Sequence, residues 1–174
     1  TNATTATGTI GYNASGNVLL GQLNSTSGDI NVTAGGVISD NTALETPNLT
    51  TLGTATLSSV QGIGATGAAD IDTAIGTLVA TNNTSGDIFI HETNGLIIAG
   101  TGVRTLAGNG NINIDVDAGA LNVNSVVTAN GSGTVTLNAD AGAIALAAVV
   151  SSTTGSILIS GDTVNQNAGG NIKT

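Results

Sequence analysis

The chain has 174 residues, of which 40% are hydrophobic and only 7% are charged, and its formal net charge is −9. Its basic residues are Arg104 and Lys173 alone, too few to displace counterions from a polyanion, so nucleic acid and anionic membrane surfaces are excluded as partners. The longest apolar run, residues 143–150, is too short to cross a bilayer, so we expect no membrane insertion.

The first 40 residues carry two short blocks of the same design. One block opens its two segments at Gly8 and Gly16, and the next opens them at Gly28 and Gly36. Each glycine precedes a short alternating or apolar segment, and a corner of glycine, alanine, serine or asparagine separates the two segments. This pattern is typical of two strands joined by a tight corner.

Residues 41–80 depart from this rhythm. The stretch holds the only proline, Pro47, and two weaker strand candidates at residues 54–57 and 71–78. We interpret it as a less regular part of the same repeating β fold, a solenoid of stacked coils, with an enlarged loop at residues 41–48.

A glycine motif in this stretch, Gly62-x-Gly64-x-x-Gly67, matches the dinucleotide-binding fingerprint by letter. That fingerprint needs a strand before it, a long helix after it and parallel βαβ units around it, and the rest of the chain does not supply them. We therefore expect a glycine-rich corner followed by a strand or a short helical turn.

Regularity returns in the second half of the chain. Gly86, Gly110, Gly133 and Gly155 each open a Gly-x-aliphatic-x-aliphatic segment, at steps of 24, 23 and 22 residues. Residues 110–121 and 133–144 are near-copies of each other. A repeat of this length, with strand patterning and no helix-length pattern, predicts one coil of a β-solenoid.

The sequence therefore predicts an all-β fold in which residues 1–174 form a single solenoid segment. With roughly 20–24 residues per coil there are about seven coils, and a rise of about 4.8 Å per coil gives a length on the order of 35 Å. Equivalent residues should form two inward aliphatic ladders along the axis: Ile88, Ile112, Val135 and Ile157, and beside them Ile90, Ile114, Leu137 and Ile159.

The repeat resembles a family of secreted proteins. Residues 85–90, Ser-Gly-Asp-Ile-Phe-Ile, with Asn94-Gly95-Leu96 after them, resemble the repeats of large bacterial surface exoproteins, the filamentous-haemagglutinin-like and autotransporter-like giant adhesins. Residues 62–78 are also similar to a segment common in those proteins. The resemblance covers most of residues 27–159 and rests on composition and period. It implies a right-handed parallel β-helix, secretion across the outer membrane, and a role in surface structure or adhesion.

Two groups of residues are candidates for chemistry. Asp115, Asp117 and Asp140 could meet on one side of neighbouring coils, but hard cations need six or more oxygen ligands, so we predict solvated corner residues and leave a structural cation open. His91 and Glu92 form the only histidine site, and without cysteine or a second histidine we expect exposed strand-end residues. We predict no catalytic, cofactor-binding or metal-binding site, and no enzyme.

The expected function is structural or adhesive. We predict an extracellular segment at the bacterial cell surface that forms a stiff rod, stalk or surface fibre within a longer repetitive array. Its expected partners are further coils, joined end to end through open solenoid ends, and a host-surface or matrix ligand. The alternative is a β-helix domain that binds or degrades polysaccharide. Degradation would need a carboxylate cluster with a basic partner, and binding would favour aromatic platforms, of which only Tyr12 and Phe89 are candidates.

Overall fold

The computed structural model describes residues 2–42 and 44–174. Thr1 and Ala43, which belong to the predicted solenoid and its loop, lie outside the described residues. Within the described part there is no helix, and so none that is long and apolar enough to cross a membrane. The strands are β1 (Ala3–Thr5), β2 (Ile10–Ala14), β3 (Val18–Leu20), β4 (Leu23–Ser25), β5 (Ile30–Ala34), β6 (Ile38–Asp40), β7 (Leu49–Ser59), β8 (Ile71–Asn82), β9 (Ile88–Glu92), β10 (Leu96–Thr105), β11 (Ile112–Val116), β12 (Leu121–Val123), β13 (Val127–Ala129), β14 (Val135–Leu146), β15 (Val149–Ser152), β16 (Ile157–Gln166) and β17 (Asn171–Lys173).

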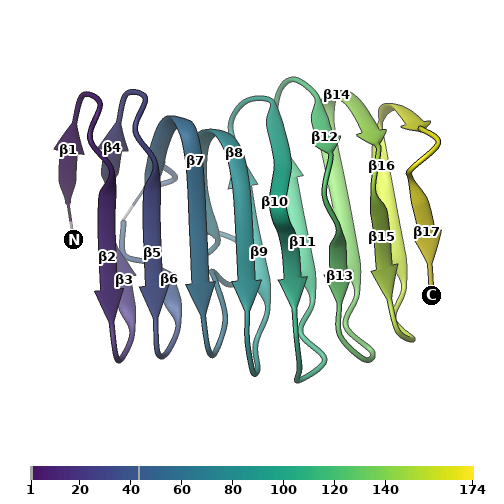
Figure 1. The fold of residues 1–174 in the computed structure, drawn as a ribbon, viewed down its shortest axis with the longest axis horizontal. Helices are drawn as coiled ribbons and strands as arrows, with labels where there is room; N and C mark the ends of the chain where they lie inside the picture. The colour runs from purple at the N-terminus through teal and green to yellow at the C-terminus, as the bar shows by residue number, and fades with distance from the viewer. Residues whose placement is uncertain (1, 43) are drawn as a thin grey trace.

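The strands stack into a right-handed parallel β-solenoid of about seven coils, which confirms the predicted fold class. Every strand pairs in parallel with its equivalents in the neighbouring coils. In Figure 1 the front strands β2, β5, β7 and β8 run downward and the rear strands run upward, while the chain advances from left to right. This sense of winding is right-handed, and it places the two termini at opposite ends of the solenoid.

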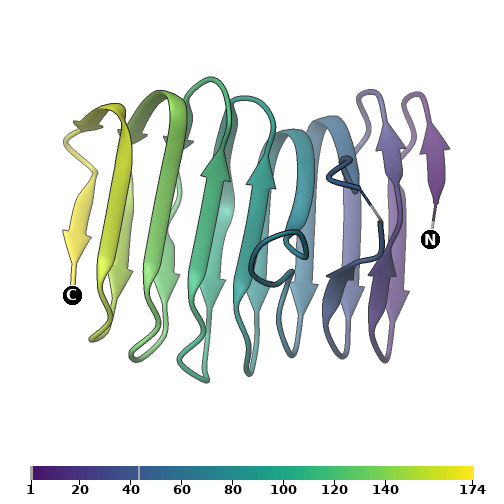
Figure 2. The ribbon, with the colours of Figure 1, turned by 180° about the vertical axis from the view of Figure 1, so that it is seen from behind.

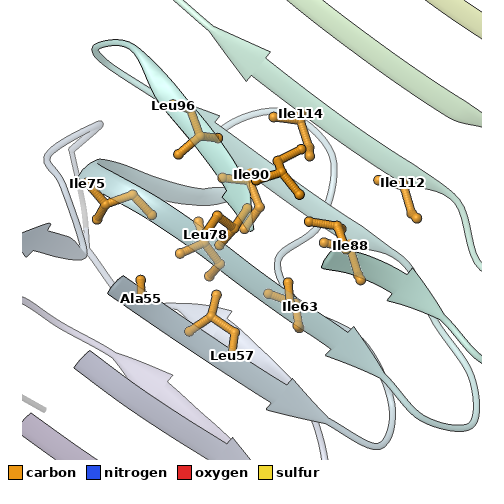
Figure 3. Close-up of a cluster of buried hydrophobic side chains, with 14 of the residues drawn as sticks. Ala55, Leu57, Ile63, Ile75, Leu78, Ile88, Ile90, Leu96, Ile112 and Ile114 are labelled. Carbon is orange, nitrogen blue, oxygen red and sulfur yellow. The ribbon is translucent and has the colours of Figure 1, made fainter. Parts of the chain in front are cut away.

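The predicted aliphatic ladders form the core. Ile112 pairs with Ile88 on one side and with Val135 on the other, and Val135 pairs in turn with Ile157, so equivalent residues stack in register. The side chains of Ile88, Ile112 and Val135 are fully buried. Figure 3 shows the centre of this core, where aliphatic side chains from consecutive coils meet inside the solenoid. With no aromatic residue among the buried ones, β-branched and leucine side chains fill the interior, as their strand propensity favours.

A second ladder, of glycines, explains why each repeat begins with this residue. A Cβ atom on Gly110 would lie 2.0 Å from the carbonyl oxygen of Gly86, and one on Gly133 would lie 2.1 Å from that of Gly110. Gly155 meets Gly133 in the same way, at 2.1 Å. A side chain at these positions would push neighbouring coils apart, so the glycine is required by the close approach of the backbones.

Asparagine and aspartate side chains connect the coils next to this glycine ladder. Oδ1 of Asp87 accepts a hydrogen bond of 2.7 Å from the backbone N–H of Asn111, and Oδ1 of Asn111 accepts one of 2.9 Å from the N–H of Thr134. Oδ1 of Asp29 accepts one of 2.9 Å from the N–H of Thr54. In each pair the acceptor lies on the earlier coil and the donor on the later coil.

The stretch at residues 41–80 contains two of the long strands, β7 and β8, and the strand candidates at 54–57 and 71–78 are parts of them. Its irregularity comes from two loops, before β7 and before β8. Figure 2 shows that both loops project from the same side of the solenoid. We refer to residues 41–42 and 44–48 as the first loop and to residues 64–70 as the second loop.

The second loop interrupts the part of its coil that pairs with β9. Ile63 pairs with Ile88, whereas Ile71, after the loop, pairs with Ile90. Gly62, Gly64 and Gly67 of the dinucleotide-like motif all have positive φ angles, which glycine adopts readily. A strand, β8, follows the motif instead of a helix, so the interpretation as a glycine-rich corner is confirmed.

Candidate functional site

The negative charge of the chain is concentrated on one side of the solenoid. Here the start of β8 pairs with β9, β9 pairs with β11, and β11 pairs with the first half of β14. We call this surface, together with the two loops that project from it, the acidic face. It carries six of the eleven acidic residues, which are Glu45, Asp70, Asp72, Asp115, Asp117 and Asp140.

His91 lies at the centre of the acidic face, between two carboxylates. Its Nδ1 is 2.9 Å from Oδ1 of Asp72 on the preceding coil, and its Nε2 is 2.8 Å from Oδ1 of Asp117 on the following coil. Because an ionised carboxylate only accepts hydrogen bonds, both contacts are satisfied together when the ring is a doubly protonated imidazolium. Burial alone lowers the pKa of His91, but the bonds to Asp117 and Asp72 outweigh it and raise the pKa to about 9.

The stability of the metal-free protein is expected to fall as the pH rises from about 6.5 to about 9. Below 6.5 both the folded and the unfolded chain hold the His91 proton; above it the unfolded chain loses the proton first, and the folded chain loses it near its pKa of about 9. The loss should be about 1 kcal/mol, because partly exposed ion pairs are screened. Urea unfolding across this pH range with a chelator present measures it, and His91→Gln should flatten the profile. An equally steep profile in the variant would contradict the assignment to His91.

A second group of ligand-type atoms surrounds the same histidine. Glu45 from the first loop, Asp70 at the end of the second loop, Asp72 of β8 and His91 of β9 each place one such atom within 4.8 Å of the others. Oδ1 of Asp70 is buried and has no hydrogen-bond partner among the described residues. Burial, with the negative charges of Asp72 and Glu45 in addition, raises the pKa of Asp70 to about 6, although His91 opposes the shift.

Glu92 differs from the expectation of an exposed residue and is a correction. It alternates with His91 along β9, so His91 faces outward and Glu92 faces the interior, where it is fully buried. Its carboxylate accepts hydrogen bonds from the Oγ1 of Thr73 at 2.7 Å and from the backbone N–H groups of Ile75 and Asn94. Burial raises the pKa of Glu92, and these hydrogen bonds counteract the rise.

The three aspartates proposed from the sequence lie on the acidic face, but polar side chains already bind them: Asp115 and Asp140 share Asn138, and Asp117 contacts His91. The Nδ2 of Asn138 donates to Oδ1 of Asp115 at 2.9 Å and to Oδ1 of Asp140 at 2.6 Å, whereas Asp117 bonds to His91. Within the described ranges, the one group whose atoms have the spacing of metal ligands is the set around His91, not these three. The structural cation left open at Asp115, Asp117 and Asp140 therefore stays untested, and the set around His91 lies on the same face.

The two basic residues lie on other strands. Arg104 is on β10, where it pairs with Thr81 and Thr128, and Lys173 is on β17, at the end of the stack. Two surface hollows are lined by residues other than the four of the cluster. One, of about 490 Å³, is lined by uncharged residues, three of them from the first loop, and the other, of about 290 Å³, is lined by polar residues, Ala74 and the exposed Leu52. In the acidic cluster Glu45 is exposed, Asp70 and His91 are half-buried and Asp72 is buried, and His91 is the basic residue that contacts it.

No protein-family model matches this chain, and comparisons with curated proteins and with solved structures found no significant match.

Proposed function

We propose that this chain is a structural segment of an extracellular, bacterial cell-surface protein, in which stacked coils form a stiff rod or fibre that supports adhesion. The supporting observation is the continuous parallel stack. Backbone hydrogen bonds, the aliphatic core, the glycine ladder and the Asp/Asn bonds all run along one axis, and neither loop interrupts it. The low charge of the other faces permits close lateral packing of such rods.

Extension of the proposed rod is supported by two exposed aliphatic side chains in the last coil. Val164 and Ile172 occupy inward positions, paired with Ile144 and Val150, which are fully buried one coil earlier. In the last coil they are 45% and 43% exposed, because no further coil covers them. Open solenoid ends also present unpaired backbone groups. In the proposed function another coil, either of a continuing chain or of a second copy, covers this surface.

The purified chain is expected to form end-to-end filaments with a strand spacing of about 4.8 Å along the filament axis. Cryo-electron microscopy of concentrated protein measures this directly. The double variant Val164→Lys/Ile172→Lys places charges at the inward positions of the open coil and should abolish the filaments. Leu158→Lys is the matched control, because Leu158 faces outward on the same coil and is already 60% exposed.

Two results would contradict the proposal. One is a compact monomer at every concentration, with no difference between the double variant and the wild type. The other is cleavage of a polysaccharide by the purified chain, which would favour the alternative of a polysaccharide-degrading β-helix domain.

A further inference from the structure

We propose that Glu45, Asp70, Asp72 and His91 form a binding site for a divalent metal cation that accepts one imidazole and several carboxylate ligands, with Zn²⁺ as the best match. The site is distant from the open ends of the solenoid and does not depend on the proposed structural function. The proposal stands on the geometry of the four side chains, on the orientation of the imidazole and on a buried oxygen without a partner.

The ligand set comes from three separate parts of the chain. The first loop supplies Glu45, the second loop and the start of β8 supply Asp70 and Asp72, and β9 supplies His91, with the four ligand atoms within 4.8 Å of one another. Imidazole nitrogen together with carboxylate oxygen suits zinc and related transition metals better than calcium or magnesium, which prefer oxygen ligands alone.

His91 has the orientation that a metal-binding histidine needs. Its Nε2 lies 2.8 Å from Oδ1 of Asp117 on the opposite side from Asp72, so Asp117 holds the ring while Nδ1 faces the cluster. A metal-ligating histidine commonly donates its second N–H to a carboxylate in this way, which fixes the ring and increases its basicity. When a cation takes the Nδ1 lone pair, the proton at that nitrogen passes to solvent.

Asp70 supplies the second observation. Its Oδ1 is buried from solvent and has no hydrogen-bond partner among the described residues. A buried carboxylate oxygen without a partner is unfavourable unless a proton or a cation satisfies it. Three carboxylates gather at this point and neither Arg104 nor Lys173 is near them, so a divalent cation would neutralise charge that His91 neutralises only in part.

The cation would add a link through Glu45 to the two hydrogen bonds between Asn48 and Asp72, which already join the end of the first loop to β8. The two loops interrupt the repeat, and the backbone ladder does not pair them with each other. A shared ligand sphere would attach both loops to β8 and β9 and would fix them on the acidic face (Figure 2). The site therefore combines binding of a cation with ordering of the two projecting loops.

Isothermal titration of the purified chain with Zn²⁺ tests the proposal, with Mn²⁺ and Ca²⁺ titrated for comparison. We expect saturable binding of one Zn²⁺ per chain and a melting temperature that rises with Zn²⁺ concentration. Asp70→Asn and His91→Gln should each weaken binding at least about tenfold, and Asp117→Asn, which loses only the orienting carboxylate, should weaken it about tenfold. Circular dichroism verifies that each variant remains folded.

Asp140→Asn is the matched control, because it removes one negative charge from the same face without altering the four ligands. It should leave the affinity within about twofold of the wild type, since exposed charges act weakly over several ångströms. Co²⁺ gives an independent measurement, because visible absorption bands should appear in the wild type and weaken in His91→Gln. Absence of saturable Zn²⁺ binding, or an affinity that Asp70→Asn and His91→Gln both retain, would overturn the site. Filament formation by the same chain is measured separately, so either proposal can fail alone.

Discussion

Gly110→Ala is expected to destabilise the solenoid by about 3 kcal/mol or more. The new methyl group would lie 2.0 Å from the carbonyl oxygen of Gly86, and because that contact is with backbone, only a separation of the coils can relieve it. Separation would stretch the hydrogen bonds between β9 and β11 and between β11 and β14. Urea unfolding followed by far-ultraviolet circular dichroism measures the effect.

The matched control for this experiment is Gly16→Ala. No heavy atom outside its chain neighbours lies within 4 Å of a Cβ at Gly16, so the added methyl group meets open space. The free energy of unfolding should stay within about 1 kcal/mol of the wild type, since the substitution also restricts the unfolded chain. Gly133→Ala repeats the test one coil later, and equal stability of all three variants would show that the close approach is not required.

Glu92→Ala is expected to destabilise the protein by about 3 kcal/mol. Truncation removes the acceptor for the hydroxyl of Thr73 and for the N–H groups of Ile75 and Asn94, and buried donors without partners are costly. Glu92→Gln keeps one carbonyl oxygen and should lose less. Thermal and urea unfolding compare the two variants.

Asp162→Ala provides the baseline for the Glu92 variants. Asp162 is an exposed acidic residue on β16, so its removal changes the net charge equally but should alter the free energy of unfolding by no more than about 0.5 kcal/mol. A Glu92→Ala variant as stable as this control would indicate that the buried hydrogen bonds contribute nothing.

The regular part of the fold was predictable because it repeats. Spacing between glycines defined the coils, and alternation within each Gly-x-aliphatic-x-aliphatic segment defined which side chains face inward. The structure confirms the pairing of Ile88 with Ile112 and of Ile114 with Leu137. A solenoid translates sequence period directly into spatial register, because each coil contacts only its neighbours.

The cluster around His91 was not predictable in the same way. Glu45 and Asp70 come from loops whose lengths break the period, so no spacing in the sequence brings them together. The second loop also shifts the register of its coil, so Asp72 pairs with His91 at a separation of 19 residues instead of about 23. The period of the repeat determines where residues of the regular coils lie. The positions of residues in the inserted loops depend on how each loop folds.

The burial of Glu92 did have a signal in the sequence. Ile88 and Ile90 were assigned to the inward ladder, and strict alternation along a strand places residue 92 on the same side. His91 and Glu92 are adjacent on the strand and therefore face opposite directions, His91 outward and Glu92 inward. The hydroxyl of Thr73 and the two N–H groups that satisfy the carboxylate come from the neighbouring coil and the next corner, which the pattern alone does not reveal.

The Asp/Asn bonds between coils give the molecule a direction of growth. Asp29, Asp87 and Asn111 each accept from a later coil, so a completed coil presents a preformed acceptor to the segment that follows it. If winding starts at the amino end, each new coil meets side-chain acceptors that are already in place. If winding starts at the carboxyl end, the backbone N–H donors form first and their side-chain acceptors are still missing. These bonds between Asp or Asn side chains and the following coil therefore favour growth of the stack from the amino end towards the carboxyl end.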